Sequence, residues 1–293
     1  MSCQSAVTTI TTTTEGMLKE ARSFHTKKRL GQHFLVDAEL LQSIAAASHA
    51  TTGDTVLEIG PGAGFLTRFL LNTGAHVVAI DLDRDAIGYL KARNYDNLTL
   101  EHGDFLQMDL QQITPERKTF KVVGNVPYQI TGLILGHLLG EIGRPAPWLS
   151  RIENIVITVQ KEVAERMVAT PGSKDYSQVS LLVSYFCQAH IVQVIPPDAF
   201  FPRPKVTSAV VSLTPAAGVR VECRNHTLLR QVIKAGFKQR RKMLKNNLSF
   251  LRLSPDEIGE IFERLNFDPQ VRAERLSLEQ FARLTDAIDQ KSV

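Results

Sequence analysis

The feature that most constrains the fold is a repeated alternation of short apolar runs with segments of helical periodicity between residues 55 and 160. Short apolar runs bounded by glycine or polar residues are typical of buried strands, and apolar residues that recur every three or four positions are typical of helices. The expected strands are residues 55–60, 76–81, 98–104, 120–125 and 152–160. Because helical patterns separate them, the region predicts an α/β fold with a mostly parallel sheet covered by helices on both faces.

Two further strands are expected at residues 187–195 and 209–214, as an antiparallel hairpin at one edge of the sheet. Beyond them the pattern becomes helical, and Ser254 with Glu257 has the spacing of a capping box. We therefore expect three parts, a flexible leader, an α/β domain and a small all-helical domain: residues 1–22, 23–216 and 217–293.

Basic residues are concentrated in two places, although the net charge of +4 is modest. Nine Lys or Arg and one acidic residue lie between residues 220 and 245. Clusters of this kind are typical of phosphate binding, and a solvated helix face is the alternative explanation. A second cluster lies near the N-terminus. The residues of the two clusters that we expect to contact phosphate groups are Lys27, Lys28, Arg29, Lys238, Arg240, Arg241, Lys242 and Lys245.

The three cysteines are scattered, which argues against a disulfide scaffold and against a structural zinc site, so no metal is expected. No apolar run approaches the roughly 20 residues that a membrane span needs. The opening Thr-rich stretch lacks the layout of a signal peptide. These features predict a cytoplasmic protein that makes no membrane contact.

Three glycines, Gly60, Gly62 and Gly64, stand where the first strand meets the first helix, the expected ligand crevice of an open α/β sheet. Asp81 ends the second strand, where a carboxylate can accept the hydroxyl protons of a ribose. Asp104 and Phe105 follow the third strand and could hold an adenine. A dinucleotide is one candidate ligand. A dinucleotide site has the pattern Gly-x-Gly-x-x-Gly, but here position 65 is Phe and the third glycine comes one residue early. The spacing therefore suits S-adenosylmethionine better, since that cofactor has a ribose and an adenine but no phosphate to bind.

The sequence "NVPY" follows the fourth strand and would face the same crevice. The side-chain carbonyl of Asn125 and the main-chain carbonyl of Val126 could accept the two N–H groups of an adenine amine, which localises its lone pair for attack on a methyl group. Pro127 would fix the backbone and Tyr128 would stack on the base. Catalysis of this kind depends on positioning and desolvation. A simple Asn/Pro turn is the alternative.

A base must leave its stack to reach such a pocket, at a cost of roughly a few kcal/mol. Phe200, in "DAFFPRPKV", is expected to form the opposite face of a stacking slot for this base. A core aromatic beside a proline bend is the other explanation for Phe200.

From about Lys27 to Leu284 the chain resembles the ribosomal RNA adenine N6,N6-dimethyltransferases of the KsgA/Dim type. The stretches that carry the resemblance are "KKRLGQHFL", "EIGPGAGFLT", "GDFL", "GNVPYQIT", "VQKEVAERM", "FFPRPKVTSAVV", "FKQRRKMLKNNL" and "RLSLEQF". The resemblance implies a Rossmann-like S-adenosylmethionine-dependent methyltransferase domain with a small helical C-terminal domain. It also implies a monomeric enzyme that dimethylates two adjacent adenosines in a hairpin near the 3′ end of small-subunit (16S) rRNA, within an immature ribosomal subunit.

The resemblance also assigns cofactor contacts. His33 and Leu35 would lie over the methionine end of the cofactor, with the turn at Gly60 and Gly62 beneath it. Asp81 would bind the ribose, and Asp104 with Phe105 would hold the adenine. Asn125 would border both the cofactor and the target amine. The chain differs from many relatives at two of these positions, where Asp81 replaces Glu and His33 replaces Asn.

Three alternatives remain at this level. An Erm-type enzyme, which methylates an adenine of large-subunit rRNA, would share "NVPY" and the glycine turn. A non-catalytic assembly or transcription factor would have no need of Asp81, Asp104 and Asn125. A DNA adenine methyltransferase is disfavoured because the C-terminal region contains no recognisable reader of duplex DNA.

Overall fold

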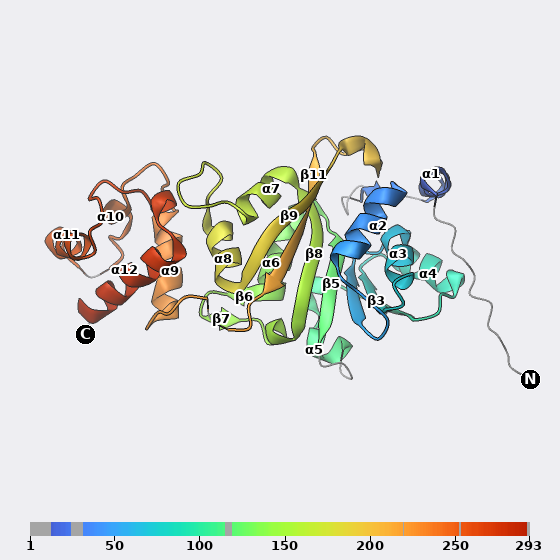
Figure 1. The fold of residues 1–293 in the computed structure, drawn as a ribbon, viewed down its shortest axis with the longest axis horizontal. Helices are drawn as coiled ribbons and strands as arrows, with labels where there is room; N and C mark the ends of the chain where they lie inside the picture. The colour runs from blue at the N-terminus through green and yellow to red at the C-terminus, as the bar shows by residue number, and fades with distance from the viewer. Residues whose placement is uncertain (1–12, 25–31, 115–118, 219, 252, 292–293) are drawn as a thin grey trace, which may run out of the picture.

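The centre of the computed structural model, which describes residues 13–24, 32–114, 119–218, 220–251 and 253–291, is a seven-stranded sheet of order β4-β3-β2-β5-β8-β11-β9 (Figure 1). Its strands are β2 (Thr55–Ile59), β3 (His76–Asp81), β4 (Leu98–His102), β5 (Phe120–Asn125), β8 (Ile152–Gln160), β9 (Cys187–Ile195) and β11 (Ser208–Pro215). The first five strands in this order pair in parallel, and β11 is antiparallel to both β8 and β9. The predicted α/β class and the antiparallel edge are confirmed.

Helices and short strands form the connections between the strands of the seven-stranded sheet. The helices of this part are α1 (Thr14–Ser23), α2 (Ala38–Ala47), α3 (Phe65–Leu71), α4 (Arg84–Arg93), α5 (Leu110–Ile113), α6 (Thr131–Leu139), α7 (Lys161–Met167) and α8 (Gln178–Phe186). Two short antiparallel pairs join β1 (Phe34–Leu35) to β10 (Phe200–Phe201) and β6 (Gly140–Glu141) to β7 (Arg144–Pro145).

Side chains of each strand alternate between two hydrophobic cores, one on each face of the sheet. Val56, Val123 and Val156 pack in the core that includes residues of α1, α2 and α3. Their neighbours Leu57 and Val122 pack in the other core, with residues of α6, α7 and α8. This alternation is what a strand buried on both faces requires.

The described elements after β11 are helical, and Figure 1 shows them gathered at one end of the molecule. They are α9 (His226–Gly236), α10 (Leu244–Asn247), α11 (Pro255–Arg264) and α12 (Leu278–Lys291). The predicted capping box is present, since the Ser254 amide donates to Glu257 Oε2 at 2.7 Å and the Glu257 amide donates to Ser254 Oγ at 3.2 Å. Leu229 and Phe281 belong to the same core cluster as Ile155 of the sheet, so one core runs through both parts.

The structure differs from the expected flexible leader. Residues 14–23 form α1, whose N-terminus is capped by the Thr13 hydroxyl at 3.2 Å from the Gly16 amide. Met17 and Ala21, one helical turn apart, are fully buried against the sheet domain. The Thr-rich composition had indicated a flexible leader, but part of this segment forms a short amphipathic helix. Residues 1–12 of the expected leader lie outside the described part of the chain.

No helix in the described ranges combines the length and the apolar character that a membrane crossing demands.

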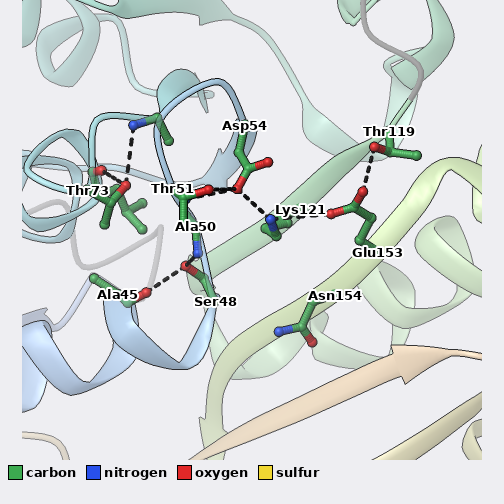
Figure 2. A network of polar contacts seen from close by, with 12 residues as sticks. Ala45, Ser48, Ala50, Thr51, Asp54, Thr73, Thr119, Lys121, Glu153 and Asn154 are labelled. Carbon is green, nitrogen blue, oxygen red and sulfur yellow. Dashed lines mark hydrogen bonds and ion pairs between the residues drawn. The ribbon is translucent and has the colours of Figure 1, made fainter.

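An ion-pair network stabilises the edge of the sheet where the parallel strands begin (Figure 2). Lys121 of β5 places its ammonium 2.6 Å from Asp54 Oδ2 and 3.3 Å from Glu153 Oε2. Thr51 donates to the same Asp54 oxygen through its amide and its hydroxyl. Burial alone would raise the pKa of Asp54, but the hydrogen bonds from Lys121 and Thr51 and the Lys121 charge outweigh it and lower this pKa.

We expect Lys121→Met to lower the free energy of unfolding at pH 7 by roughly 1–3 kcal/mol, between the values for exposed and for buried pairs. Because the folded-state pKa of Asp54 lies below its unfolded value, its contribution is present at neutral pH and is lost as the pH falls through the folded pKa. The difference between variant and wild type should therefore shrink at pH 3. Urea denaturation at both pH values measures it.

The matched control is Lys91→Met, which removes an exposed lysine of α4. A Lys121→Met penalty as small as that of the control, or one of equal size at both pH values, would show that the ion pairs contribute nothing to stability.

Candidate active site

The carboxyl ends of β2, β3, β4 and β5 meet at one edge of the sheet, and the loops that follow them carry the predicted cofactor and catalytic residues. The loop after β2 turns into α3 through Gly60 and Gly62, whose φ angles are 67° and 54°. Such values favour glycine. A Cβ built at Gly60 would meet no atom within 4 Å, and Gly60 lines a cavity. A ligand can therefore lie directly against this backbone.

Phe34 of β1 supports the glycine turn. A Cβ built at Gly62 would lie 2.6 Å from Cε1 of Phe34, so no larger residue fits at Gly62 while the ring stays in place. The side chain of Phe34 is 7% exposed. Phe34 was not among the residues predicted from the sequence. The only indication of its role was its position in "GQHFL", between the predicted residues His33 and Leu35.

Asp81, at the end of β3, binds the same glycine turn through a hydrogen bond. Its Oδ2 accepts a hydrogen bond from the Gly62 amide at 3.1 Å, and its Oδ1 accepts one from the Asp83 amide at 2.8 Å. Burial raises the pKa of Asp81, and the Asp83 charge adds to this effect, whereas the two amide hydrogen bonds oppose it. Since each carboxylate oxygen can accept more than one hydrogen bond, Asp81 keeps the capacity to accept from a ribose hydroxyl.

A second carboxyl lies beneath the turn. Glu58 of β2 is 1% exposed, and burial, with the nearby Asp81 charge, raises the pKa of Glu58 to about 8 against the opposing effect of the Thr67 hydroxyl of α3. Glu58 Oε2 has no hydrogen-bond partner among the described residues. Glu58 is therefore mostly protonated at neutral pH, and the turn carries less negative charge than its sequence indicates.

The loop after β4 forms the adenine end of the site that the sequence predicts. Asp104 Oδ1 accepts a hydrogen bond from the Leu106 amide at 3.0 Å, which begins a short 3-10 turn that presents Phe105 to the cavity. The ring of Phe105 has an edge-to-face contact with His137 of α6, with centroids 5.0 Å apart. Burial lowers the pKa of His137, which favours the uncharged form of the imidazole against the Phe105 ring.

Asn125, at the end of β5, has a fixed orientation. Its Nδ2 donates a hydrogen bond to the His33 main-chain oxygen at 2.8 Å. Because a carbonyl oxygen can only accept, the amide nitrogen must face His33. The described residues donate no hydrogen bond to Oδ1 of Asn125. The amide therefore offers a carbonyl oxygen at the wall of the cavity.

Tyr128 is held by its hydroxyl group, which lies 2.6 Å from Ser208 Oγ at the start of β11. The rings of Tyr128 and His33 are within 14° of parallel, with centroids 6.3 Å apart. The His33 ring is anchored in turn, because Nδ1 lies 2.7 Å from the Pro202 oxygen and donates to it. Two aromatic faces of fixed orientation thus border the position of Asn125.

These groups line one cavity of about 310 Å³. The predicted residues that it brings together are His33, Gly60, Gly62, Asp81, Asp104, Phe105, Asn125, Val126, Pro127 and Tyr128. Its apolar walls, which the sequence interpretation did not name, include Ile59, Ile80, Leu82, Leu106, Ile130 and Ile134. Ile59, Ile80, Leu82 and Leu106 are next to predicted residues in the sequence, which was their only signal. Ile130 and Ile134 lie in the segment after "NVPY" and had no such signal.

Two predicted residues lie outside this cavity. Leu35 and Phe200 are opposite each other in the β1–β10 pair and are 2% and 3% exposed. Both side chains belong to the hydrophobic core under the sheet. The assignment of the second stacking face to Phe200 is therefore wrong for this structure, because pairing with β1 directs its ring into the core.

The basic residues of the C-terminal part divide into two groups. Lys238, Arg241 and Lys242 are exposed in the turn between α9 and α10, and Lys245 is half-buried in α10. Arg240 differs, since its Nη2 donates to the main-chain oxygens of Lys174 and Tyr176 and lies 3.1 Å from Glu274 Oε2. Lys27, Lys28 and Arg29 lie outside the described residues.

The chemistry of the cavity distinguishes between the two cofactor candidates. It offers an open glycine backbone, acidic residues at two strand ends and an aromatic ring, which together suit an adenosine. None of its described lining residues is Lys or Arg, so no side chain there would neutralise a pyrophosphate. Within the described residues, His, Cys, Asp and Glu form no group suited to a metal ion. The lining therefore fits S-adenosylmethionine better than a dinucleotide.

Comparison with known proteins agrees with this chemistry. Residues 23–290 match the family described as ribosomal RNA adenine dimethylase. A ribosomal RNA small subunit methyltransferase A from Lachnoclostridium phytofermentans is 42% identical over 90% of this chain and 92% of its own length. The protein of the same name from Picosynechococcus is 41% identical over 90% of this chain and 97% of its own.

Solved structures show the same relationship. A dimethyladenosine transferase from Plasmodium falciparum superposes with a TM-score of 0.71 at 26% identity, covering 87% of this chain and 97% of the other. The 23S rRNA methyltransferase ErmE superposes with a TM-score of 0.66 at 25% identity, covering 88% of this chain and all of the other. With a family match that spans nearly its whole length, the chain belongs to the ribosomal RNA adenine dimethylase family.

Proposed function

We propose that the chain uses S-adenosylmethionine to dimethylate the N6 amino groups of two adjacent adenosines in the hairpin near the 3′ end of small-subunit rRNA, within an immature ribosomal subunit. The observation that carries the proposal is the orientation of Asn125. Its amide nitrogen is held by the His33 oxygen, and its own oxygen is left at the wall of the cavity that Gly60 and Asp81 also line.

The cofactor contacts follow from the cavity lining. Gly60 offers a backbone without a side chain to the methionine end, Asp81 accepts from the ribose, and Phe105 packs against the adenine ring. When bound, S-adenosylmethionine supplies an electrophilic methyl group at its sulfonium.

The chain activates the target amine by positioning it. Asn125 Oδ1 accepts one N–H of the amino group, and the Val126 main-chain oxygen accepts the other. The nitrogen lone pair, otherwise delocalised into the purine ring, is then localised and directed at the methyl group. Acceptors that are already oriented need no reorganisation during the reaction. The N–C bond would form as the bond between the methyl group and the sulfonium breaks. The methylated amine, which is then acidic, would lose its proton to water, so no strong base is required beforehand.

The target base stacks on Tyr128. His33 replaces Phe200 as the candidate for the other face, because its ring is nearly parallel to that of Tyr128 and is anchored to Pro202. The ring centroids are 6.3 Å apart. The two rings must therefore separate by roughly 1 Å to admit a base at a contact distance of about 3.5 Å on each side. Stacking on an aromatic side chain contributes about 1–3 kcal/mol per base, which offsets the cost of extruding the adenine.

The choice of small-subunit RNA is supported by the curated relatives. Those cited above are named small subunit methyltransferase A, at 41–42% identity, whereas ErmE, named for 23S rRNA, is 25% identical. Methyl transfer from labelled S-adenosylmethionine to purified immature small subunits, and in parallel to purified large subunits, tests the proposal. Mass spectrometry of the rRNA should find two adjacent dimethyladenosines near the 3′ end. Label only in the large subunit would favour an Erm-type enzyme, and no label in either would favour a non-catalytic factor.

We expect Asn125→Ala to lower kcat by about 100-fold or more, because it removes an oriented acceptor that acts on the reacting amine. Cofactor affinity should stay within about twofold, because Gly60, Asp81 and Phe105 are retained. Single-turnover methyl transfer and calorimetric titration of the cofactor measure the two effects.

Gln112→Ala removes an exposed side-chain amide of α5 and is the control for Asn125→Ala. Turnover of Asn125→Ala equal to that of the control would remove Asn125 from the mechanism.

The exposed cations of the α9–α10 turn are predicted to contact RNA phosphates. Replacing Arg241 and Lys242 by Gln should weaken RNA binding and reduce the slope of log affinity against log salt by about 1–2, as expected for two lost phosphate contacts. Filter binding over a range of salt concentrations measures the slope.

The matched pair Arg84 and Lys91, exposed on α4 at the other end of the molecule, should leave the slope unchanged. Equal slopes for both double variants would place the RNA surface elsewhere. Arg240→Gln is predicted to act differently, by lowering stability, because Arg240 binds Lys174 and Tyr176.

A further inference from the structure

Helix α1, which precedes the family's recognisable motifs, is docked beside the cofactor loop. Its buried residues Met17 and Ala21 belong to the same core cluster as Phe34 and Phe65. The Thr14 hydroxyl accepts a hydrogen bond from the Ala38 amide at 3.0 Å, which ties the start of α1 to α2. Figure 1 shows α1 at the end of the molecule where α2, α3 and α4 lie.

Glu20 anchors α1 to two other helices. Its Oε1 accepts hydrogen bonds from Arg68 of α3 and from the Tyr89 hydroxyl of α4, and it lies 2.8 Å from Nη2 of Arg93. Arg68 is 4% exposed, and Glu20 is the only carboxylate with which it forms an ion pair among the described residues. Burial alone would raise the pKa of Glu20, but the hydrogen bonds from Arg68 and Tyr89 and the two arginine charges outweigh it and lower this pKa.

Phe24, which follows α1, connects this anchor to β1. Its ring makes edge-to-face contacts with Phe34 and with Tyr89, each with centroids 5.3 Å apart. Phe34 makes a third such contact with Phe65, at 5.9 Å, and the Arg68 guanidinium lies 5.3 Å from the Phe65 centroid. Glu20 and the four aromatic rings therefore form one contiguous cluster under the glycine turn.

Two contacts lead from β1 and the residue before it into the active site. The Phe34 ring occupies the space that a Cβ of Gly62 would need, and the His33 oxygen accepts the hydrogen bond that orients Asn125. A shift of residues 33 and 34 would therefore disturb the cofactor turn and the catalytic amide together.

We propose that α1 is a positioning element for the active site. Through Glu20 and Phe24 it fixes the Phe34 ring, and thereby sets the affinity for S-adenosylmethionine and the alignment of Asn125. Glu20 and Phe24 touch neither cofactor nor substrate, and their influence passes through Phe34 and His33. The inference rests on the proposed function for the identity of the ligand, and its test does not require methyl transfer.

Calorimetric titration of S-adenosylmethionine provides the first test. Glu20→Gln should raise the Kd by about fivefold or more, the lower end of usual coupling between sites. The matched control is Glu15→Gln, which makes the same change of charge at an exposed position of the same helix and should bind as wild type does. RNA affinity should be unchanged in both.

A second variant separates positioning from folding. Phe24→Leu keeps an apolar side chain but loses the edge-to-face contacts, and it should also raise the Kd for the cofactor while the thermal midpoint changes little. A lower midpoint with wild-type cofactor affinity in both Glu20→Gln and Phe24→Leu would show that α1 has only a structural role and would overturn the proposal.

Linkage gives a test on the unaltered protein. If docking of α1 raises cofactor affinity, bound cofactor must stabilise the docked helix by the same factor. Hydrogen exchange of the amides in residues 17–23 should therefore slow by about fivefold or more with saturating S-adenosylhomocysteine. Unchanged exchange in a protein that binds the ligand would contradict the inference. Absence of any binding would instead count against the proposed function itself.

Discussion

The hydrogen bond from Asn125 Nδ2 to the His33 oxygen is the constraint on which the active site depends. It joins two segments far apart in the chain, the residue before β1 and the end of β5. Without it, the amide of Asn125 could rotate and offer its nitrogen to the cavity, and an N–H group cannot accept a hydrogen bond from an adenine amine. One contact therefore determines whether the cavity presents an acceptor or a donor to the substrate.

The two ends of the parallel strands differ in whether their polar groups are paired. At the edge where the strands begin, Lys121 satisfies Asp54 and Glu153 and contributes to stability. Where the strands end, polar groups remain available: no described residue donates a hydrogen bond to Asn125 Oδ1, and none is a hydrogen-bond partner of the buried Glu58 Oε2. Such groups lower stability unless a ligand or water satisfies them, and they are typical of functional sites. The sheet thus positions reactive groups on a core stabilised elsewhere.

Much of the fold could be predicted from the sequence because its signals are local. Strands such as 76–81 and 120–125 are bounded by glycine and polar residues, and Asn125 could be placed because it ends one of them. Features that depend on distant partners could not be predicted. The Thr-rich composition before α1 gave no indication of a helix whose packing depends on distant partners, among them Arg68 and Tyr89, which bind Glu20. Phe200 was misassigned because its pairing with β1 is not visible in its own segment.

The most direct test of the central claim is a structure of the chain with S-adenosylhomocysteine and an RNA hairpin that carries the two target adenosines. The account predicts that N6 of the extruded adenine lies within hydrogen-bond distance of Asn125 Oδ1, while Nδ2 still donates to the His33 oxygen and the base stacks on Tyr128. An adenine bound away from the cavity lined by Gly60 and Asp81, or an Asn125 amide turned with its nitrogen toward the base, would contradict it.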